Sequence, residues 1–320
     1  MSQAVAPSTT MVVHEDDRYL SFPAIVRVDK RLFIIFRAAW ANELDLDATI
    51  LICVSDDDGR TWSQPKTWVK IPGGDSRNCG GGQIGTDQAH FVYDVDYGET
   101  GGRHTFYRTI DGGGDWLAPI RLRADRAGDD RTSIGNRGII WDEQGQTLFF
   151  PHFAGNSVVV DRASGRQTQT HRLPRLECTV AWNRRGDLIM FGLGGSVDVS
   201  RDRGRTWTVL GHIYTISQPD LLQLADRRLL LCYSDQKRVN EYLLVLEDGH
   251  DMGSDPIGVK IFEGTFDGVL NSRGKAMSLE HGDQMLTVLY EACGPRGPSR
   301  IYLVWTPRSC LQAGGGTGAA

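Results

Sequence analysis

The chain has 320 residues, 38 glycines and a formal net charge of −5. This length is enough for one large domain or two small ones with a sizeable buried core. The charge is modest and no block of one sign occurs, so we expect no nucleic-acid partner, although a small basic pocket is compatible with it. No apolar run approaches the roughly 18 residues that span a membrane, so we expect no membrane association.

The six cysteines lie far apart, without the CxxC spacing of a metal or redox site. Cys53 and Cys232 stand inside apolar runs and are predicted to be buried free thiols. No histidine or carboxylate cluster has metal-ligand spacing, and no P-loop or dinucleotide fingerprint occurs, so we expect no cofactor and no metal. The first residues lack a basic region followed by an apolar run, which favours a cytoplasmic protein without a signal peptide; a leader ahead of residue 1 stays open.

Short apolar runs bounded by glycine, aspartate, asparagine and arginine recur along the chain, and long helical periodicity is absent. The recurring unit is an apolar segment, a polar turn and a second apolar segment, which predicts a β-hairpin. Six such units follow one another: Ala24–Val28 with Leu32–Phe36, Gln83–Ile84 with Ala89–Tyr93, Gly138–Trp141 with Thr147–Phe150, Cys178–Trp182 with Leu188–Phe191, Asp220–Leu224 with Leu229–Tyr233, and Ala276–Leu279 with Met285–Tyr290.

The hairpins are separated by roughly 40 to 60 residues, the length of a four-stranded propeller blade. The sequence therefore predicts an all-β fold, a single six-bladed β-propeller with four-stranded antiparallel blades and no second domain. We assign residues 15–310 to this propeller, residues 1–14 to an N-terminal extension and residues 311–320 to a disordered tail.

A second pattern follows some of these hairpins. Ser55–Trp62, Thr109–Trp116 and Ser200–Trp207 follow the frame Ser/Thr-x-Asp-x-Gly-x-Thr-Trp, with Asp115 at the threonine position of the second copy. Its aspartate can accept hydrogen bonds from backbone N–H groups just downstream, and its glycine permits a positive φ. Its tryptophan can pack the turn onto its own sheet. A degenerate copy stands at Val160–Gly165.

The frame resembles the Asp-box of bacterial neuraminidase repeats, which marks propellers of the sialidase type. The resemblance to the sialidase superfamily extends over nearly the whole chain. In that family the boxes lie at the rim of the propeller, away from the site. The resemblance therefore implies a scaffold, and the chemistry has to be sought in other residues.

Polar residues stand just before the first strand of each hairpin. Because the first strand of a propeller blade lines the central channel, we expect these residues to converge at one mouth of the channel. Such convergence predicts a ligand site; the alternative is a water-filled channel with satisfied polar walls. The predicted substrate-binding residues at or near this mouth are Ser21, Phe22, Trp40, Arg77, Asn78, Arg137, Gln218, Arg238, Arg273 and Lys275.

The basic members of this set suit a carboxylate, sulfate or phosphate on a small substrate. For each arginine the alternative is a surface charge paired with a nearby acid. Trp40 and Phe22 can supply an apolar wall for a ring, with core or rim packing as their alternative. We therefore expect a small acidic or sugar-like molecule as the partner.

Three segments match the sialidases beyond the Asp-boxes. In Asp45–Ile52, Asp45 stands in the place of the acid/base aspartate, with Asp47 as a neighbouring competitor. Glu177 resembles the glutamate that activates the family's tyrosine nucleophile. Arg238 stands where one arginine of the family's carboxylate-binding triad is found. The resemblance thus implies Asp45 and Glu177 as the catalytic pair.

The departures from the family are as specific as the matches. The opening Tyr-Arg-Ile-Pro of sialidases is replaced by Leu20–Pro23, and Phe191–Gly194 holds no second triad arginine. Arg273–Lys275 stands where the nucleophilic tyrosine is expected. Because a bidentate arginine–carboxylate contact is charge-assisted, losing two of three would remove most of the grip on a sialic acid. The double-displacement route also lacks its covalent partner.

We therefore expect a divergent sialidase-like enzyme that acts on a small acidic or glycosidic substrate, with Asp45 delivering a proton and Glu177 acting as general base. Inverting hydrolysis, or elimination or isomerisation next to a carboxylate, would fit this pair. For Glu177 the alternative is an ion pair with Arg137 or Arg238. Two other functions stay open: a non-catalytic propeller that binds a glycan or a partner, and a true sialidase with relocated arginines. The oligomeric state is not determined by these patterns.

Overall fold

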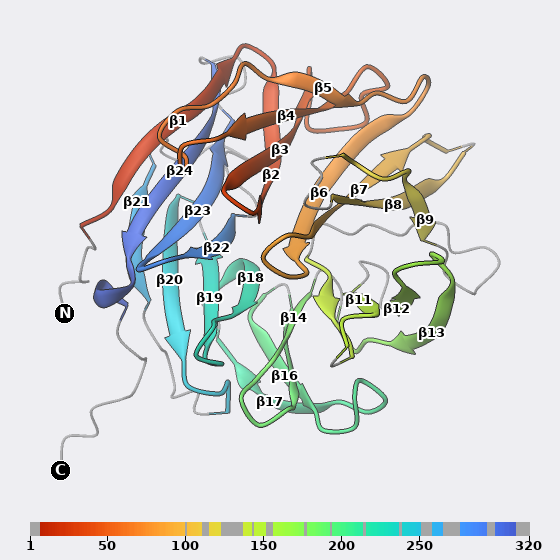
Figure 1. Ribbon diagram of the computed structural model, residues 1–320, viewed down its shortest axis with the longest axis vertical. Coiled ribbons are helices and arrows are strands. Elements are labelled where there is room, and N and C mark those ends of the chain that lie inside the picture. The colour runs from red at the N-terminus through yellow and green to blue at the C-terminus, as the bar shows by residue number, and fades with distance from the viewer. Residues whose placement is uncertain are drawn as a thin grey trace.

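Six antiparallel sheets of four strands each form a ring in the computed structural model of this chain (Figure 1). The predicted six-bladed, all-β propeller is confirmed. The structure describes residues 7–99, 101–110, 115–122, 137–142, 144–151, 156–175, 178–192, 194–213, 216–236, 239–250, 258–264, 276–292 and 298–311.

Each blade runs in chain order from its inner to its outer strand, except the last. Blades one and two are β2 (Tyr19–Val28), β3 (Arg31–Ala39), β4 (Thr49–Ser55) and β5 (Lys66–Val69), then β6 (Asp75–Gln83), β7 (Ala89–Asp96), β8 (Arg103–Ile110) and β9 (Ile120–Leu122). Blades three and four are β10 (Ile139–Ile140), β11 (Thr147–Pro151), β12 (Asn156–Asp161) and β13 (Gln167–Arg172), then β14 (Thr179–Trp182), β15 (Leu188–Phe191), β16 (Ser196–Ser200) and β17 (Thr208–His212). Blades five and six are β18 (Ser217–Gln223), β19 (Leu229–Ser234), β20 (Asn240–Leu246) and β21 (Val259–Glu263), then β22 (Met277–His281), β23 (Gln284–Glu291), β24 (Ser299–Pro307) and β1 (Thr9–Asp16). A short 3-10 helix, η2 (Arg308–Cys310), follows β24.

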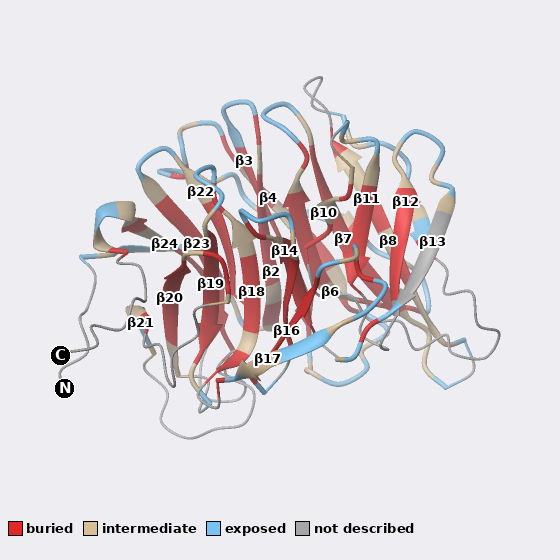
Figure 2. Ribbon diagram, turned by 90° about the horizontal axis from the view of Figure 1, so that it is seen from below, coloured by how far each residue is buried: buried red, intermediate tan, exposed pale blue. Residues whose placement is uncertain are grey.

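The six predicted hairpins are the first two strands of the six blades. Their side chains are largely buried, as the red central parts of the strands show in Figure 2, whereas the connecting turns are exposed. Phe36, Phe91, Phe149, Phe150 and Phe191 are all fully buried on second strands. Burial on both faces explains why these strands appear in the sequence as continuous apolar runs.

The N-terminal strand closes the ring. β1 pairs with β24 and forms the outermost strand of the sixth blade, so the red and blue ends of the chain meet in Figure 1. The predicted N-terminal extension, residues 1–14, therefore ends too late, because Thr9 onward belongs to the propeller. The strand β1 was not predicted for two reasons. Its partner strand lies at the far end of the chain, where Thr9 pairs with Trp305, and half of the side chains of β1 are exposed.

The Asp-box turns join the third and fourth strands of their blades. Asp57 accepts hydrogen bonds from Thr61 N (2.8 Å) and Thr61 Oγ1 (2.6 Å), and Ser55 Oγ accepts one from Gly59 N (2.8 Å). Gly59 has φ +83°, and an added Cβ would lie 3.0 Å from Leu303, so this position requires glycine. Trp62 donates to the Gly59 carbonyl (3.1 Å).

The other copies vary in how much of the motif they keep. Ser200–Trp207 repeats the aspartate and serine bonds, with Asp202 accepting from Thr206 N (2.8 Å) and Thr206 Oγ1 (2.6 Å) and Ser200 Oγ accepting from Gly204 N (2.7 Å). The indole N–H of Trp207 has no hydrogen-bond partner among the described residues. In the degenerate copy, Asp161 Oδ1 accepts hydrogen bonds from Ser164 N (2.7 Å) and Ser164 Oγ (2.5 Å). Residues 111–114 of the second copy lie outside the described residues.

Replacing Asp202 with alanine is expected to destabilise the protein at neutral pH and to lose this effect in acid. Hydrogen bonds from Thr206, and a further one from Ser200, lower the pKa of Asp202 from 3.8 to about 2. Because the folded-state pKa is lowered, the stabilisation is present above about pH 4 and is lost as the pH falls toward 2. Thermal unfolding from about pH 7 to about pH 3 should show the difference in Tm narrowing. Arg201→Ala, at an exposed position of the same turn, is the control; a gap that stays constant with pH would contradict the prediction.

The described cysteines are free thiols, and Cys53 and Cys232 are buried, as predicted. Burial raises the pKa of Cys53 to about 12, so this thiol stays protonated. Within the described part of the chain, no helix is long and apolar enough to cross a membrane.

Candidate functional site at the propeller mouth

The two faces of the ring carry different kinds of loop. Because the strands of a blade alternate in direction, the start of each inner strand shares one face with the loops between second and third strands. We call this the mouth face; loop 40–48, between β3 and β4, belongs to it. The opposite face carries the hairpin turns and the Asp-box turns, and we call it the Asp-box face.

Three predicted residues occupy equivalent, strained backbone positions on the mouth face. Phe22, Asn78 and Gln218 have φ of 51°, 53° and 50°, and each lies in a register shift near the start of an inner strand, β2, β6 or β18. Non-glycine residues rarely adopt this left-handed conformation, and such outliers cluster at ligand sites. A β-bulge also redirects the side chains around it. The bulges thus distinguish this end of the channel from ordinary sheet, which no sequence pattern had indicated.

A buried ion pair organises the mouth between the first two blades. Arg37 and Asp75 are both fully buried, with Nε–Oδ1 and Nη2–Oδ2 distances of 3.0 and 2.9 Å. The same guanidinium donates to the carbonyl oxygens of Ala41 (2.8 Å) and Glu43 (3.0 Å). Arg37 therefore holds loop 40–48 in place. Neither Arg37 nor Asp75 was among the predicted residues. The position of Arg37 inside the apolar run Phe33–Ala39 could have indicated the pair, because a buried arginine requires an acidic partner.

Arg77 shares the carboxylate of Asp75. Its Nη1 lies 3.3 Å from Asp75 Oδ2, and its Nη2 donates to the Asn42 carbonyl (3.0 Å). Its Nε is buried and has no hydrogen-bond partner among the described residues. Burial, together with the charges of Arg37 and Arg103, lowers the pKa of Arg77 despite the opposing effect of Asp75. Two guanidinium groups thus share one carboxylate, which leaves one positive charge in excess.

Asp45 lies on loop 40–48, as expected, but its carboxylate is engaged by the loop itself. Oδ2 accepts a hydrogen bond from Trp40 N (2.6 Å) and Oδ1 one from Asp47 N (2.9 Å). Its own N–H donates to Asp75 (3.1 Å). The side chain of Trp40 is 71% exposed. Asp47 is exposed and pairs with Lys70 at 3.4 Å. Asp45 thus acts as a structural brace whose oxygens already have two donors.

Arg137 lies inside the ring. It was predicted to contact a substrate, but its hydrogen-bond partners are groups of the protein itself. Its Nε and Nη2 donate to Asp220 (3.2 and 2.6 Å), and Nη2 also donates to the Ser278 carbonyl (2.6 Å). Arg137 is 4% exposed and Asp220 1%. This ion pair joins the third blade to the fifth and sixth across the channel. Asp220 thus neutralises Arg137, while Glu177, the partner named in the alternative, lies outside the described residues.

A neutral histidine lies beside this ion pair. His90 Nε2 accepts a hydrogen bond from Gly138 N (3.2 Å). Complete burial, with the nearby charge of Arg137, lowers the pKa of His90 to about 3. His90 is therefore neutral at neutral pH.

The remaining predicted residues divide between packed positions and undescribed segments. Ser21 is fully buried, and the Phe22 ring contacts Tyr290 at a centroid distance of 6.0 Å. Asn78 donates to the buried carboxylate of Asp94 (2.9 Å), and Gln218 is half-buried. Glu177, Arg238, Arg273 and Lys275 lie outside the described residues.

Tyr19 also belongs to the mouth, although no sequence pattern pointed to it. Its hydroxyl hydrogen-bonds Tyr290, and burial raises its pKa to about 12 in spite of the nearby Arg37 and Arg77. Its phenol therefore stays protonated and can donate a hydrogen bond at neutral pH.

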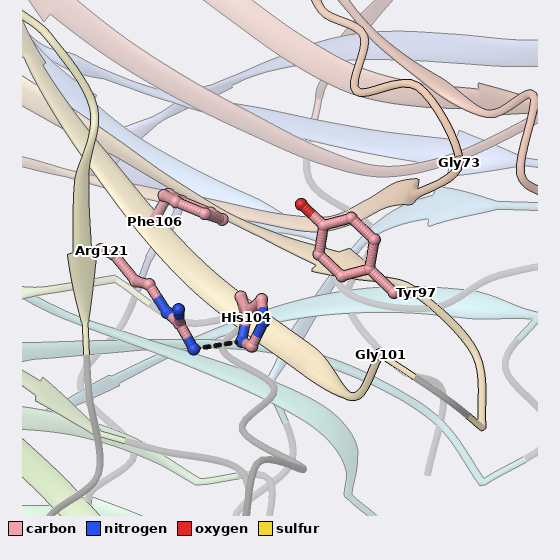
Figure 3. A pocket seen from close by; sticks show the side chains of 6 residues that line it. All are labelled: Gly73, Tyr97, Gly101, His104, Phe106 and Arg121. Carbon is pink, nitrogen blue, oxygen red and sulfur yellow. Dashed lines mark hydrogen bonds between the residues drawn. The ribbon is translucent and has the colours of Figure 1, made fainter.

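A pocket of 680 Å³ opens at the outer part of the second blade, and Figure 3 shows the side chains that line it. Tyr97, His104, Phe106 and Arg121 line it, and Arg121 Nη2 lies 2.6 Å from His104 Nδ1. The loop that carries Tyr97 also contacts Leu44 of loop 40–48, since a Cβ on Gly98 would lie 3.2 Å from that side chain. No group of three or more histidine, cysteine or acidic residues in the described segments could hold a metal ion.

Comparisons with solved structures agree with this architecture. A protein of unknown function from Dyadobacter fermentans matches with a TM-score of 0.73 at 17% identity, over 96% of this chain and 100% of that one. The sialidase of Trypanosoma rangeli in complex with sialic acid matches with a TM-score of 0.66 at 14% identity, over 95% of this chain but only 59% of the sialidase. NanB sialidase from Streptococcus pneumoniae matches with a TM-score of 0.67 at 13% identity, over 94% and 71%.

These likenesses define the fold. The chain has the six-bladed propeller fold of the sialidases, as the Asp-boxes predicted, and at these identities the likeness extends to the fold alone. No family model matches the sequence. No curated protein matches it either.

Proposed function

We propose that this propeller binds a small acidic or sugar-like molecule at its mouth face, without a catalytic role for the described residues. The observation that carries the proposal is that two guanidinium groups, those of Arg37 and Arg77, share the single carboxylate of Asp75, and that Arg77 keeps 13% of its side chain exposed. A guanidinium whose counter-charge is shared suits a carboxylate, sulfate or phosphate. Trp40, exposed on the adjoining loop, offers an apolar ring face to a sugar.

Three further features support binding. The strained residues at the starts of β2, β6 and β18 resemble the backbone outliers found at ligand sites. One structural neighbour, the Trypanosoma rangeli sialidase, binds sialic acid, which is an acidic sugar. Asp45 and Arg137 are engaged by the protein itself, which favours binding over acid–base chemistry.

Calorimetric titration with N-acetylneuraminic acid, glucuronic acid and glucose tests this proposal. We expect the acids to bind more tightly than glucose and Arg77→Gln to remove that preference. Trp40→Ala should weaken binding several-fold without changing Tm, because the side chain is 71% exposed. Val209→Ala, at an exposed position on β17, is the matched control. Acid binding that survives both mouth substitutions unchanged would reject the mouth as the site.

A divergent acid–base enzyme is the second candidate function. The observation in its favour is that Asp45 lies half-buried on the mouth loop, directly beside the exposed Trp40. In this proposal Asp45 and Glu177 act as a general acid and base, and each is expected to contribute about a hundredfold or more to turnover. Fluorogenic glycosides of sialic and uronic acids provide the assay. Full turnover by the Asp45→Asn and Glu177→Gln variants would exclude it, and hydrolysis of the sialoside would favour a true sialidase.

A further inference from the structure

A second pocket lies on the Asp-box face, away from the mouth. It measures 470 Å³ and is formed where the ends of β10, β14 and β18 meet the Asp-box turn of the fourth blade. The residues that give it its chemistry are Trp141, Asp142, Trp182, Arg203, Gln223 and Arg227. Its size falls within the range of pockets that enclose small ligands. None of these residues takes part in the mouth described above.

Arg203 is held rigidly at one wall of this pocket. Its guanidinium lies 5.4 Å from the Trp141 ring centroid and 5.9 Å from that of Trp182, and its Nη2 donates to the Trp141 carbonyl (2.5 Å). Trp141 is in turn stacked on Phe149, with centroids 4.6 Å apart. Cation–π contact and this hydrogen bond fix the direction of the guanidinium while leaving its other N–H groups available. A pre-oriented guanidinium loses little entropy when it binds a ligand.

Arg227 supplies a second cation. It is exposed in the turn between β18 and β19, and among the described residues its guanidinium has no hydrogen-bond or ion-pair partner. The neighbouring Asp226 is already paired with Arg228 (2.8 Å) and with Arg308 (3.0 Å). Asp226 is therefore not available to neutralise Arg227.

The remaining polar groups leave the pocket with one excess positive charge. The Asp142 carboxylate accepts hydrogen bonds from Gln146 N (2.7 Å) and Thr147 Oγ1 (2.6 Å), so it holds its own turn and neutralises one arginine only. Gln223 donates through Nε2 to the Trp182 carbonyl (2.7 Å), which orients its amide and leaves Oε1 as an acceptor. The pocket thus combines two guanidinium groups, an oriented amide oxygen and the edges of two indole rings.

We propose that this pocket is a binding site for a sugar acid of monosaccharide size. The carboxylate lies between Arg203 and Arg227, since guanidinium groups pair with carboxylates through charge-assisted hydrogen bonds. A ring hydroxyl donates to Gln223, and the apolar face of the ring lies against the tryptophan edges. This site is independent of the mouth, and it can be occupied whether or not the mouth binds a ligand.

The experiment is a calorimetric titration with glucuronate, glucose and inorganic sulfate. It uses protein carrying Trp40→Ala and Arg77→Gln, so that the mouth does not contribute. In this background we add Arg203→Asp with Arg227→Asn. Both changes preserve the backbone. The Asp-box Ser55–Trp62 has Asp58 at the position that corresponds to Arg203, with the same φ of 59°. At Arg227 the φ is 67°, a conformation that asparagine tolerates. Arg184→Gln is the control, because Arg184 lies on the adjacent hairpin turn and pairs with Glu247 (3.1 Å) outside the pocket.

We expect glucuronate to bind the background protein, the Arg203/Arg227 variant to bind it at least tenfold more weakly, and Arg184→Gln to bind it equally well. Raising the salt concentration should weaken this binding, since it depends on charge. The proposal is overturned if glucuronate does not bind, if the Arg203/Arg227 variant keeps the affinity, or if glucose or sulfate binds as tightly as glucuronate. Loss of binding caused only by Trp40→Ala and Arg77→Gln would test the proposed function of the mouth and would leave this pocket without a bound ligand, which also overturns the proposal.

Discussion

Replacing Asp220 with alanine is expected to lower the free energy of unfolding by about 3–5 kcal/mol. The substitution leaves the Arg137 guanidinium buried at 4% exposure without its counter-charge, and it removes the acceptor of the Ser278 N–H (3.2 Å). A buried charge that loses its partner carries its full desolvation penalty. Because Arg137 bridges the third, fifth and sixth blades, the loss should affect the whole ring cooperatively. Denaturant-induced unfolding followed by tryptophan fluorescence measures it.

Two companion variants separate burial from charge. Glu247→Ala removes an exposed partner of Arg184, whose side chain is 47% exposed, and should cost no more than about 1 kcal/mol. Replacing both buried partners, by Arg137→Met with Asp220→Leu, should recover much of the loss, since an apolar pair has no charge to desolvate. If Asp220→Ala costs no more than Glu247→Ala, the cross-channel pair does not contribute to stability in the way we infer.

The fold could be predicted where its determinants are local. Each inner hairpin, such as Ala24–Val28 with Leu32–Phe36, joins two apolar strands by a short turn, so both strands and their pairing are visible in one window of sequence. The Asp-boxes are equally local, since Asp57 is bonded within four residues. The closing strand β1 was missed because its register depends on β24 at the other end of the chain.

The candidate site was predicted less completely, for a related reason. The position of a residue in its blade gave the correct end of the channel for Phe22, Asn78 and Gln218. It did not give the direction of a side chain, and so Arg137 was expected to contact a substrate at the mouth, whereas it turns inward to Asp220, 83 residues away. Arg37 was not predicted to belong to the site, although it holds the mouth loop, because its partner Asp75 belongs to the next blade. Single-sequence patterns do not report which acid neutralises which base.

Asp75→Ala is expected to have a second large effect, about 3–5 kcal/mol on unfolding, together with loss of order in loop 40–48. Asp75 is fully buried and neutralises the fully buried Arg37, while Arg77 and the Asp45 N–H bond the same carboxylate. Without it, two guanidinium groups repel each other in a poorly hydrated site. Unfolding by denaturant measures the first effect, and amide hydrogen exchange in residues 40–48 measures the second.

Asp45→Ala distinguishes the loop from the ion network. It removes the hydrogen bonds to Trp40 N and Asp47 N but leaves Arg37 and Asp75 paired, so exchange in loop 40–48 should rise while global stability falls by only about 1 kcal/mol. Arg37→Lys should resemble Asp75→Ala more closely, because an ammonium cannot bond the carboxylate and the carbonyls of Ala41 and Glu43 together. Equal losses of stability in Asp45→Ala and Asp75→Ala would show that the loop, and not the buried charge, determines the stability of this region. The mouth would then be held by loop 40–48 itself more than by the buried pair of Arg37 and Asp75.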